Sequence, residues 1–140
     1  MFVFLTVMSQ AGLEVVLTLG MKGPRWPEFH IPAWAESDLD NEDITADRKL
    51  CDRCLDYVES LVNHVQAYSC IVAFQIENEP LDKAGEKRQV VGIDFVAEEA
   101  NLVRKVSERV WSRRNKMLTL SFFLGRPLTK LSVRYSATQA

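Results

Sequence analysis

Residues 70–80 read Cys-Ile-Val-Ala-Phe-Gln-Ile-Glu-Asn-Glu-Pro, a continuous apolar run that ends in three polar residues before a proline. An apolar run of this length without alternation is typical of a strand buried in a parallel sheet. Proline cannot donate a hydrogen bond to a neighbouring strand, so it marks where pairing stops. The segment therefore predicts a buried parallel strand that carries polar side chains at its carboxyl end.

The sequence on either side of this strand alternates between strand and helix patterns. Two other apolar runs predict strands, over residues 13–19 and 117–123. Two stretches place apolar residues three and four apart, as on one face of a helix, and they cover residues 44–68 and 93–110. A short helix is expected over residues 1–11. Strands alternating with helices in this way predict an α/β fold with about three parallel strands and flanking helices.

Length and composition bound the architecture. The chain has 140 residues, of which 47% are hydrophobic and 26% are charged, as in an ordinary soluble domain. It predicts one domain over residues 1–140, and it is too short for a complete eight-stranded α/β barrel, which takes about 250 residues. No stretch reaches the roughly 18 consecutive apolar residues of a membrane span, so no membrane partner is expected.

The charges are distributed unevenly along the chain. All 19 acidic residues lie before residue 110, whereas six of the 17 basic residues follow it. These six are dispersed among apolar residues and do not form the cluster with interleaved aromatic residues that marks a nucleic-acid interface. We expect no nucleic-acid partner, and we interpret residues 126–140 as an atypical tail.

The three cysteines predict no metal site and no disulfide framework. Cys51 and Cys54 fall on the apolar face of the 44–68 helix, which favours buried free thiols. A structural zinc would need four ligands, and Cys70, His30 and His64 do not provide a matching spacing. We expect no metal and no cofactor, and an odd cysteine count favours a reducing, cytoplasmic compartment.

The acidic pair after the central strand is the first candidate for chemistry. A carboxyl group crowded by a second carboxylate in apolar surroundings has a raised pKa, which suits a general acid near neutral pH. Glu79 is the candidate for this role. The alternative is that Glu77 and Glu79 are solvated side chains at a strand end, where the regular pleat is expected to fail before Pro80.

The stretch Phe74-Gln-Ile-Glu-Asn-Glu-Pro80 resembles the fourth-strand signature of the clan A glycoside hydrolases, which are retaining (β/α)8-barrel enzymes such as cellulases, mannanases and β-galactosidases. The resemblance implies that Glu79 is the catalytic acid/base and that Asn78 binds the sugar 2-hydroxyl. It covers residues 1–125 and implies a partial barrel, roughly units three to five, that takes a carbohydrate substrate.

The long loop after the first strand supplies candidate substrate-binding residues. Three prolines exclude a helix from this loop, and long ordered loops are often functional. Arg25, Trp26 and His30 are the candidates, because aromatic faces stack on sugars and polar side chains bind hydroxyl groups. The alternative is a structural role, and we expect Trp34 and Phe29 to pin the loop to the domain.

A second catalytic carboxylate is not assigned. A retaining glycosidase needs a nucleophile, which the resemblance puts after the seventh strand, and Glu28 and Glu36 do not match its motif. We therefore interpret the chain as an inactive internal fragment that self-associates through open sheet edges. The rival hypothesis is a non-catalytic carbohydrate-binding or interaction α/β module. A flavodoxin-like domain is disfavoured because neither Gly20–Gly23 nor Gly85 forms a phosphate-binding glycine loop.

Overall fold

The protein is an α/β structure built on one parallel sheet. A computed structural model of the chain describes residues 2–23, 28–35, 41–111 and 117–120. Within these residues the sheet has the order β1 (Val15–Leu19), β2 (Ile71–Ile76) and β3 (Met117–Leu120), and both pairings are parallel. The connecting helices are α2 (Arg48–Val65), between β1 and β2, and α3 (Ile93–Trp111), between β2 and β3. The predicted α/β class is therefore confirmed.

A short helix, α1 (Phe2–Gln10), precedes β1, as the apolar start of the chain predicts. Beyond it, Gly12 has a φ of 67°, which is a left-handed conformation that glycine adopts without strain. None of the helices that the structure describes combines the length and the apolar composition that crossing a bilayer requires.

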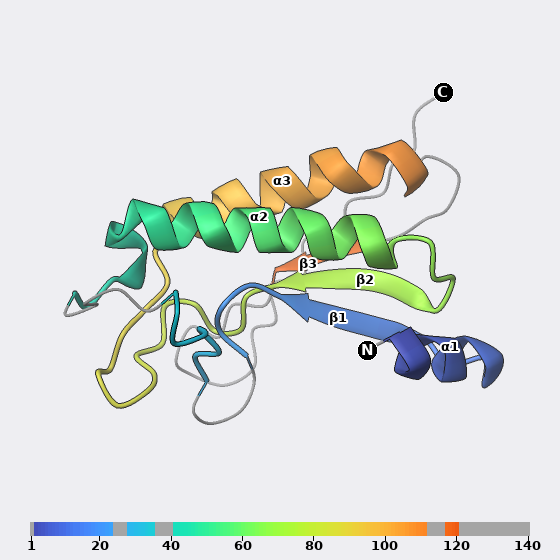
Figure 1. Cartoon of the computed structure of the whole chain (residues 1–140), viewed down its shortest axis with the longest axis horizontal. Coiled ribbons are helices and arrows are strands. Elements are labelled where there is room, and N and C mark those ends of the chain that lie inside the picture. Colours follow the sequence, from blue (N-terminus) through green and yellow to red (C-terminus); the bar gives the residue numbers. More distant parts are fainter. Residues whose placement is uncertain (1, 24–27, 36–40, 112–116, 121–140) are drawn as a thin grey trace.

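The two long helices lie together on one face of the sheet (Figure 1). Strand register places Leu17 beside Phe74 and Leu19 beside Ile76, and these side chains contribute to the apolar core that both helices enter. The opposite face is less evenly covered, since Ala73 on that face is buried whereas other residues are not. Val16 is 55% exposed, and the paired residues Thr18 and Gln75 are half-buried.

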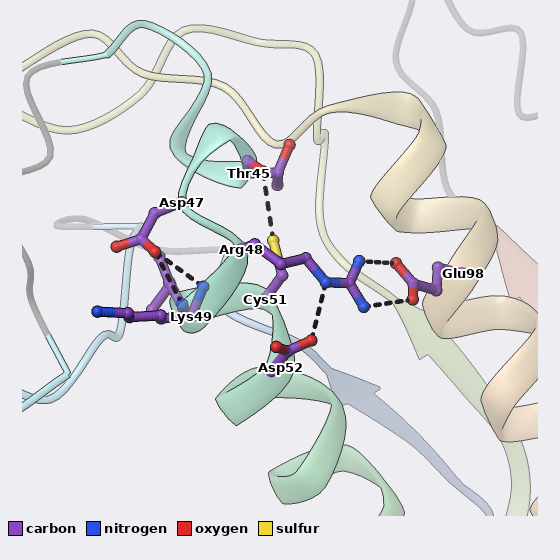
Figure 2. Close-up of polar contacts among 8 residues, drawn as sticks. Thr45, Asp47, Arg48, Lys49, Cys51, Asp52 and Glu98 are labelled. Carbon is purple, nitrogen blue, oxygen red and sulfur yellow. Dashed lines mark hydrogen bonds and ion pairs between the residues drawn. The ribbon is translucent and has the colours of Figure 1, made fainter.

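Helix α2 begins later than the apolar spacing predicts. A 3-10 turn, η1 (Ile44–Ala46), comes first, and Asp47 then adopts an extended backbone conformation and caps α2. The Asp47 carboxylate accepts hydrogen bonds from the backbone N–H groups of Lys49 and Leu50, at 2.9 and 3.3 Å (Figure 2). The side chain thereby satisfies N–H groups that have no partner within the helix.

The first residue of α2 also connects the two helices. The guanidinium of Arg48 donates to both carboxylate oxygens of Glu98 on α3, at 2.7 and 2.8 Å, and its Nε pairs with Asp52 at 2.8 Å (Figure 2). Arg48 and Asp52 are both mostly exposed. An exposed pair of this kind contributes less to stability than a cap, because water and salt screen the charges.

Removing the cap is expected to destabilise the protein measurably. We expect Asp47→Ala to lower the free energy of unfolding by about 1 kcal/mol, because two helix N–H groups lose their acceptor. The matched control is Asp52→Ala, five residues further along the chain and inside α2, for which a loss below about 0.5 kcal/mol is expected. Urea denaturation followed by circular dichroism measures both, and equal losses would contradict the capping role.

Candidate functional site

The site lies where β1 and β2 end, at the same edge of the sheet. The carboxylate of Glu77, which follows β2, is fully buried and accepts hydrogen bonds from the two backbone N–H groups that follow β1. Its Oε1 accepts from Met21 at 2.8 Å and its Oε2 from Lys22 at 2.6 Å. The Glu77 backbone N–H donates to the carbonyl of Leu19 at 3.1 Å. A single side chain thus joins the ends of two strands.

Glycine at position 20 makes this approach possible. Gly20 has a φ of 96°, and a Cβ atom there would lie 2.2 Å from Oε1 of Glu77. Any other residue would therefore collide with the carboxylate, and it would also be strained at this backbone angle. The Glu77 carboxylate occupies the space that the missing side chain leaves.

The strand pleat fails beyond Ile76, as the sequence predicts. Glu77 and Glu79 have φ values of 49° and 47°, in the left-handed region that residues with a side chain seldom adopt. Such backbone strain is concentrated at functional sites, because the surrounding structure must hold it in place. The residues on both sides of Asn78 thus have this backbone conformation, which sets the directions of the Glu77, Asn78 and Glu79 side chains.

A buried lysine holds the Glu79 segment against the end of β1. The side chain of Lys22 is 1% exposed, and its ammonium donates to the backbone carbonyls of Glu79 and, at 2.7 Å, of Asp82. Burial lowers the pKa of Lys22, while the surrounding carboxylates act in the opposite direction. The lysine is therefore a structural brace for the turn that carries Glu79.

Asn78 is oriented from two sides. Its backbone N–H donates to the carbonyl of Lys22 at 3.0 Å, and its Oδ1 accepts from the side-chain amide of Gln75 at 3.2 Å. The same amide also donates to the carbonyl of Glu77, at 3.2 Å. Asn78 and Glu79 are both half-buried at the sheet edge, where a ligand can reach them.

A second carboxyl group lies behind Glu77. Glu99 of α3 is fully buried, and its Oε1 accepts from the Cys54 thiol of α2 at 3.4 Å. Burial raises the pKa of Glu77 to about 7 and that of Glu99 to about 9, and the charge of Glu77 contributes to the rise at Glu99. Burial alone raises the pKa of Glu77, because the contact with the Glu99 side chain lowers it. The carboxyl group whose pKa a neighbouring carboxylate raises is therefore Glu99.

The Cys54–Glu77–Glu99 cluster favours a proton over a metal ion. Potential ligand atoms of the three residues lie within 4.8 Å of one another, the one such group found in the described part of the chain. Both oxygens of Glu77 are, however, already engaged by backbone N–H groups. Burial also raises the pKa of the Cys54 thiol, so the thiolate that a metal would need is disfavoured.

The loop after β1 returns to the same edge of the sheet. Lys22 and Phe29 form an antiparallel bridge, and the N–H of Gly23 donates to the carbonyl of Glu28 at 2.7 Å. The exposed His30 side chain lies over Gly23, since a Cβ there would be 2.9 Å from the histidine Cδ2. The other two loop candidates, Arg25 and Trp26, lie outside the described residues.

Phe29 and Trp34 were both expected to pin the loop to the domain, and only Phe29 does so. Phe29 packs against the apolar core. Trp34 is 74% exposed and does not pin the loop by burial, which corrects the expectation. The guanidinium of Arg53 on α2 instead lies over its ring, 5.8 Å from the centroid. Such a cation–π contact can form on an exposed indole because the guanidinium of Arg53 keeps its contact with water.

Sequence reasoning missed three residues that build the site, namely Lys22, Glu77 as an anchor, and Glu99. A signal for Glu99 was present, because it falls three residues after Val96 and four before Val103, within the apolar face of α3. A charged residue at such a position needs a buried partner. For Lys22 no such pattern exists, because it lies in a loop.

Comparisons with known proteins identify no relative: no protein-family model matches the sequence, and no curated protein or solved structure has a significant match.

Proposed function

We propose that the chain is a segment of a retaining glycoside hydrolase that cleaves β-linked O-glycosides, with Glu79 as the acid/base and Asn78 as a substrate-binding residue. One observation carries the proposal: the Asn78-Glu79 pair lies at the carboxyl edge of a parallel sheet, and Glu79 has a strained, left-handed backbone conformation. Ligands bind at this edge in α/β folds. The position and the residue types therefore agree with the resemblance of residues 74–80.

We further propose that the sheet is a sector of an eight-stranded barrel. Its strands follow one another in chain order, and α2 and α3 lie on the same face (Figure 1). In a barrel the helices form an outer ring and the opposite face points inward. The small or partly polar residues Ala73, Thr18 and Gln75 on that face fit an interior that further strands would close.

The contacts of the first loop disfavour a nucleotide-binding α/β domain. In such domains the backbone N–H groups after the first strand bind phosphate. Here the N–H groups of Met21 and Lys22 are taken by the Glu77 carboxylate. An anion at this position would face a carboxylate, so the edge is suited to a neutral ligand such as a sugar.

The barrel is tested first by the coding sequence on either side of this reading frame. We expect it to encode further strand–helix units, in frame or shifted, with a carboxylate after a later strand. Flanking sequence without such units would contradict the barrel.

The role of Glu79 is then tested in the completed protein. Glu79→Gln is expected to lower kcat/KM about 10²–10⁴-fold for a β-glycoside with an alkyl alcohol leaving group, which needs protonation to depart. For an aryl glycoside whose phenolate leaves without a proton, kcat/KM is expected to change far less. Glu86→Gln, at an exposed position in the loop after β2, is the matched control and is expected to be without effect. Equal losses on both substrates would contradict the acid role.

A further inference from the structure

The buried carboxyl pair Glu77–Glu99 connects the candidate site to the helical layer. Glu77 belongs to the segment after β2, Glu99 to α3, and both are fully buried. Each presents an oxygen within 4.8 Å of the other and of the Cys54 sulfur. Two ionised carboxylates this close in an apolar interior repel one another strongly, so the pair is expected to hold a proton.

The hydrogen bonds decide which residue carries that proton. Both oxygens of Glu77 accept backbone N–H groups, which favours its ionised form. Glu99 accepts only the weak thiol donor on Oε1, and its Oε2 is buried without a hydrogen-bond partner. An unpaired carboxylate oxygen is costly when buried, whereas the neutral acid is less so.

The other charged and titratable groups around the pair do not remove the repulsion. Lys22, from the loop after β1, is the nearby cation, but its ammonium is directed to the carbonyls of Glu79 and Asp82. Cys54, from α2, contributes a thiol whose pKa burial raises. Glu98, from α3 itself, adds a further negative charge to the surroundings of Glu99.

We propose that Glu99 is a positioning residue that keeps its proton as the pH rises above neutral, and that this proton allows Glu77 to be ionised there and to hold the ends of β1 and β2 together. Three contacts connect Glu77 to the candidate site residues Asn78 and Glu79. Glu77 fixes the backbone of Lys22, the backbone carbonyl of Lys22 binds the N–H of Asn78, and its ammonium binds the carbonyl of Glu79. This role does not depend on the chemistry that Glu79 performs.

The sign of the pH dependence follows from the pKa values. Burial raises the pKa of Glu99 to about 9, well above the value of about 4.5 for an unperturbed glutamate. The folded protein then binds more protons than the unfolded chain at intermediate pH, so stability is fully present in acid and is lost as pH rises toward about 9. The pKa of Glu77 is lower, about 7, so above pH 7 Glu77 is mostly ionised while Glu99 keeps its proton.

The test compares Glu99→Gln with the wild-type chain. Glutamine has the shape of the protonated acid but cannot ionise. Between about pH 7 and pH 9 the folded-to-unfolded ratio of the wild type is expected to fall by up to about tenfold per pH unit, and the variant is expected to lack this contribution. Lys22 and Cys54 are present in both proteins, so the difference between the two curves isolates Glu99.

The matched control is Glu98→Gln, the same chemical change one residue earlier. Arg48 lowers the pKa of Glu98, whose charge is the smallest of the contributions to the pKa of Glu99, so this substitution is expected to change the alkaline decline far less than Glu99→Gln does. Denaturation curves measured at each pH supply the ratios. Identical slopes for wild type and Glu99→Gln would overturn the proposal. A wild-type slope that changes on treatment with a chelator would also overturn it, because a metal ion rather than a proton would then be shared.

Infrared spectroscopy tests the same proton directly and does not depend on unfolding. At about pH 8, where Glu77 is mostly ionised, the wild type is expected to show the carbonyl stretching band of a buried protonated carboxylic acid, and Glu99→Gln is expected to lack that band. If the band is absent from the wild type, or persists in the variant, Glu99 does not carry the proton.

Discussion

Replacing Gly20 by alanine is expected to lower the free energy of unfolding by about 3–5 kcal/mol. The new Cβ would lie 2.2 Å from a carboxylate oxygen of Glu77, so the carboxylate must move. Its displacement would remove the acceptors of the Met21 and Lys22 N–H groups, and each buried donor left unsatisfied costs about 1–3 kcal/mol. The φ of 96° adds backbone strain for any residue with a side chain.

Gly12→Ala is the control that separates the collision from the strain. Gly12 also has a positive φ, 67°, but nothing lies within 4 Å of the position that its Cβ would occupy. A loss of about 1–2 kcal/mol, from backbone strain alone, is expected there. Urea denaturation followed by circular dichroism measures both variants, and equal losses at the two positions would show that the Glu77 carboxylate does not depend on Gly20.

The elements of the fold were predictable because their signals are local. The apolar run over residues 70–76 and the three- and four-residue spacing over residues 93–110 each identify one element, and the structure has β2 and α3 there. The boundaries were less predictable at the start of α2. Residues 44–46 continue the apolar pattern, but the carboxylate of Asp47 is a better cap and begins the helix at Arg48.

The edge at which the site lies was predictable from strand order, but the contacts within it were not. Parallel pairing requires the segments after β1 and β2 to meet, and Glu77 and Lys22 do meet. The sequence has two glutamates there, and nothing local distinguishes the buried anchor from the partly exposed one. That distinction depends on the space above Gly20 and on Glu99, which come from segments far along the chain.

The exposure of Trp34 illustrates the same limit. An indole is usually buried, so a loop tryptophan is reasonably expected to pin its loop. The neighbouring Ala35 is buried instead, and Trp34 lies under the guanidinium of Arg53. Which of two adjacent residues faces the core depends on the turn that precedes them, and a single sequence gives little information about it.

The 140-residue chain on its own is expected to hydrolyse no glycoside at a measurable rate, even if Glu79 is the acid/base. A retaining mechanism needs two carboxyl groups about 5–5.5 Å apart, one of which forms the glycosyl intermediate. General acid catalysis contributes about 10²–10⁴-fold, which does not replace covalent catalysis of a very slow reaction. The nucleophile is expected after a strand that follows β3 in a complete barrel.

The absence of glycosidase activity and the self-association of the chain are expected to have the same cause. Within the described part of the chain, β1 and β3 form the two edges of the sheet, and unpaired edges promote self-association. The strands that would cover these edges in a barrel are the ones that would carry the nucleophile. Monomeric protein, isolated by size-exclusion chromatography, should therefore be assayed beside Glu79→Gln on β-glycosides with an alkyl alcohol leaving group, whose departure needs the acid. Turnover by the parent that this substitution abolishes would mean that a second carboxylate of this chain already serves as the nucleophile, and the partial-barrel interpretation would fail.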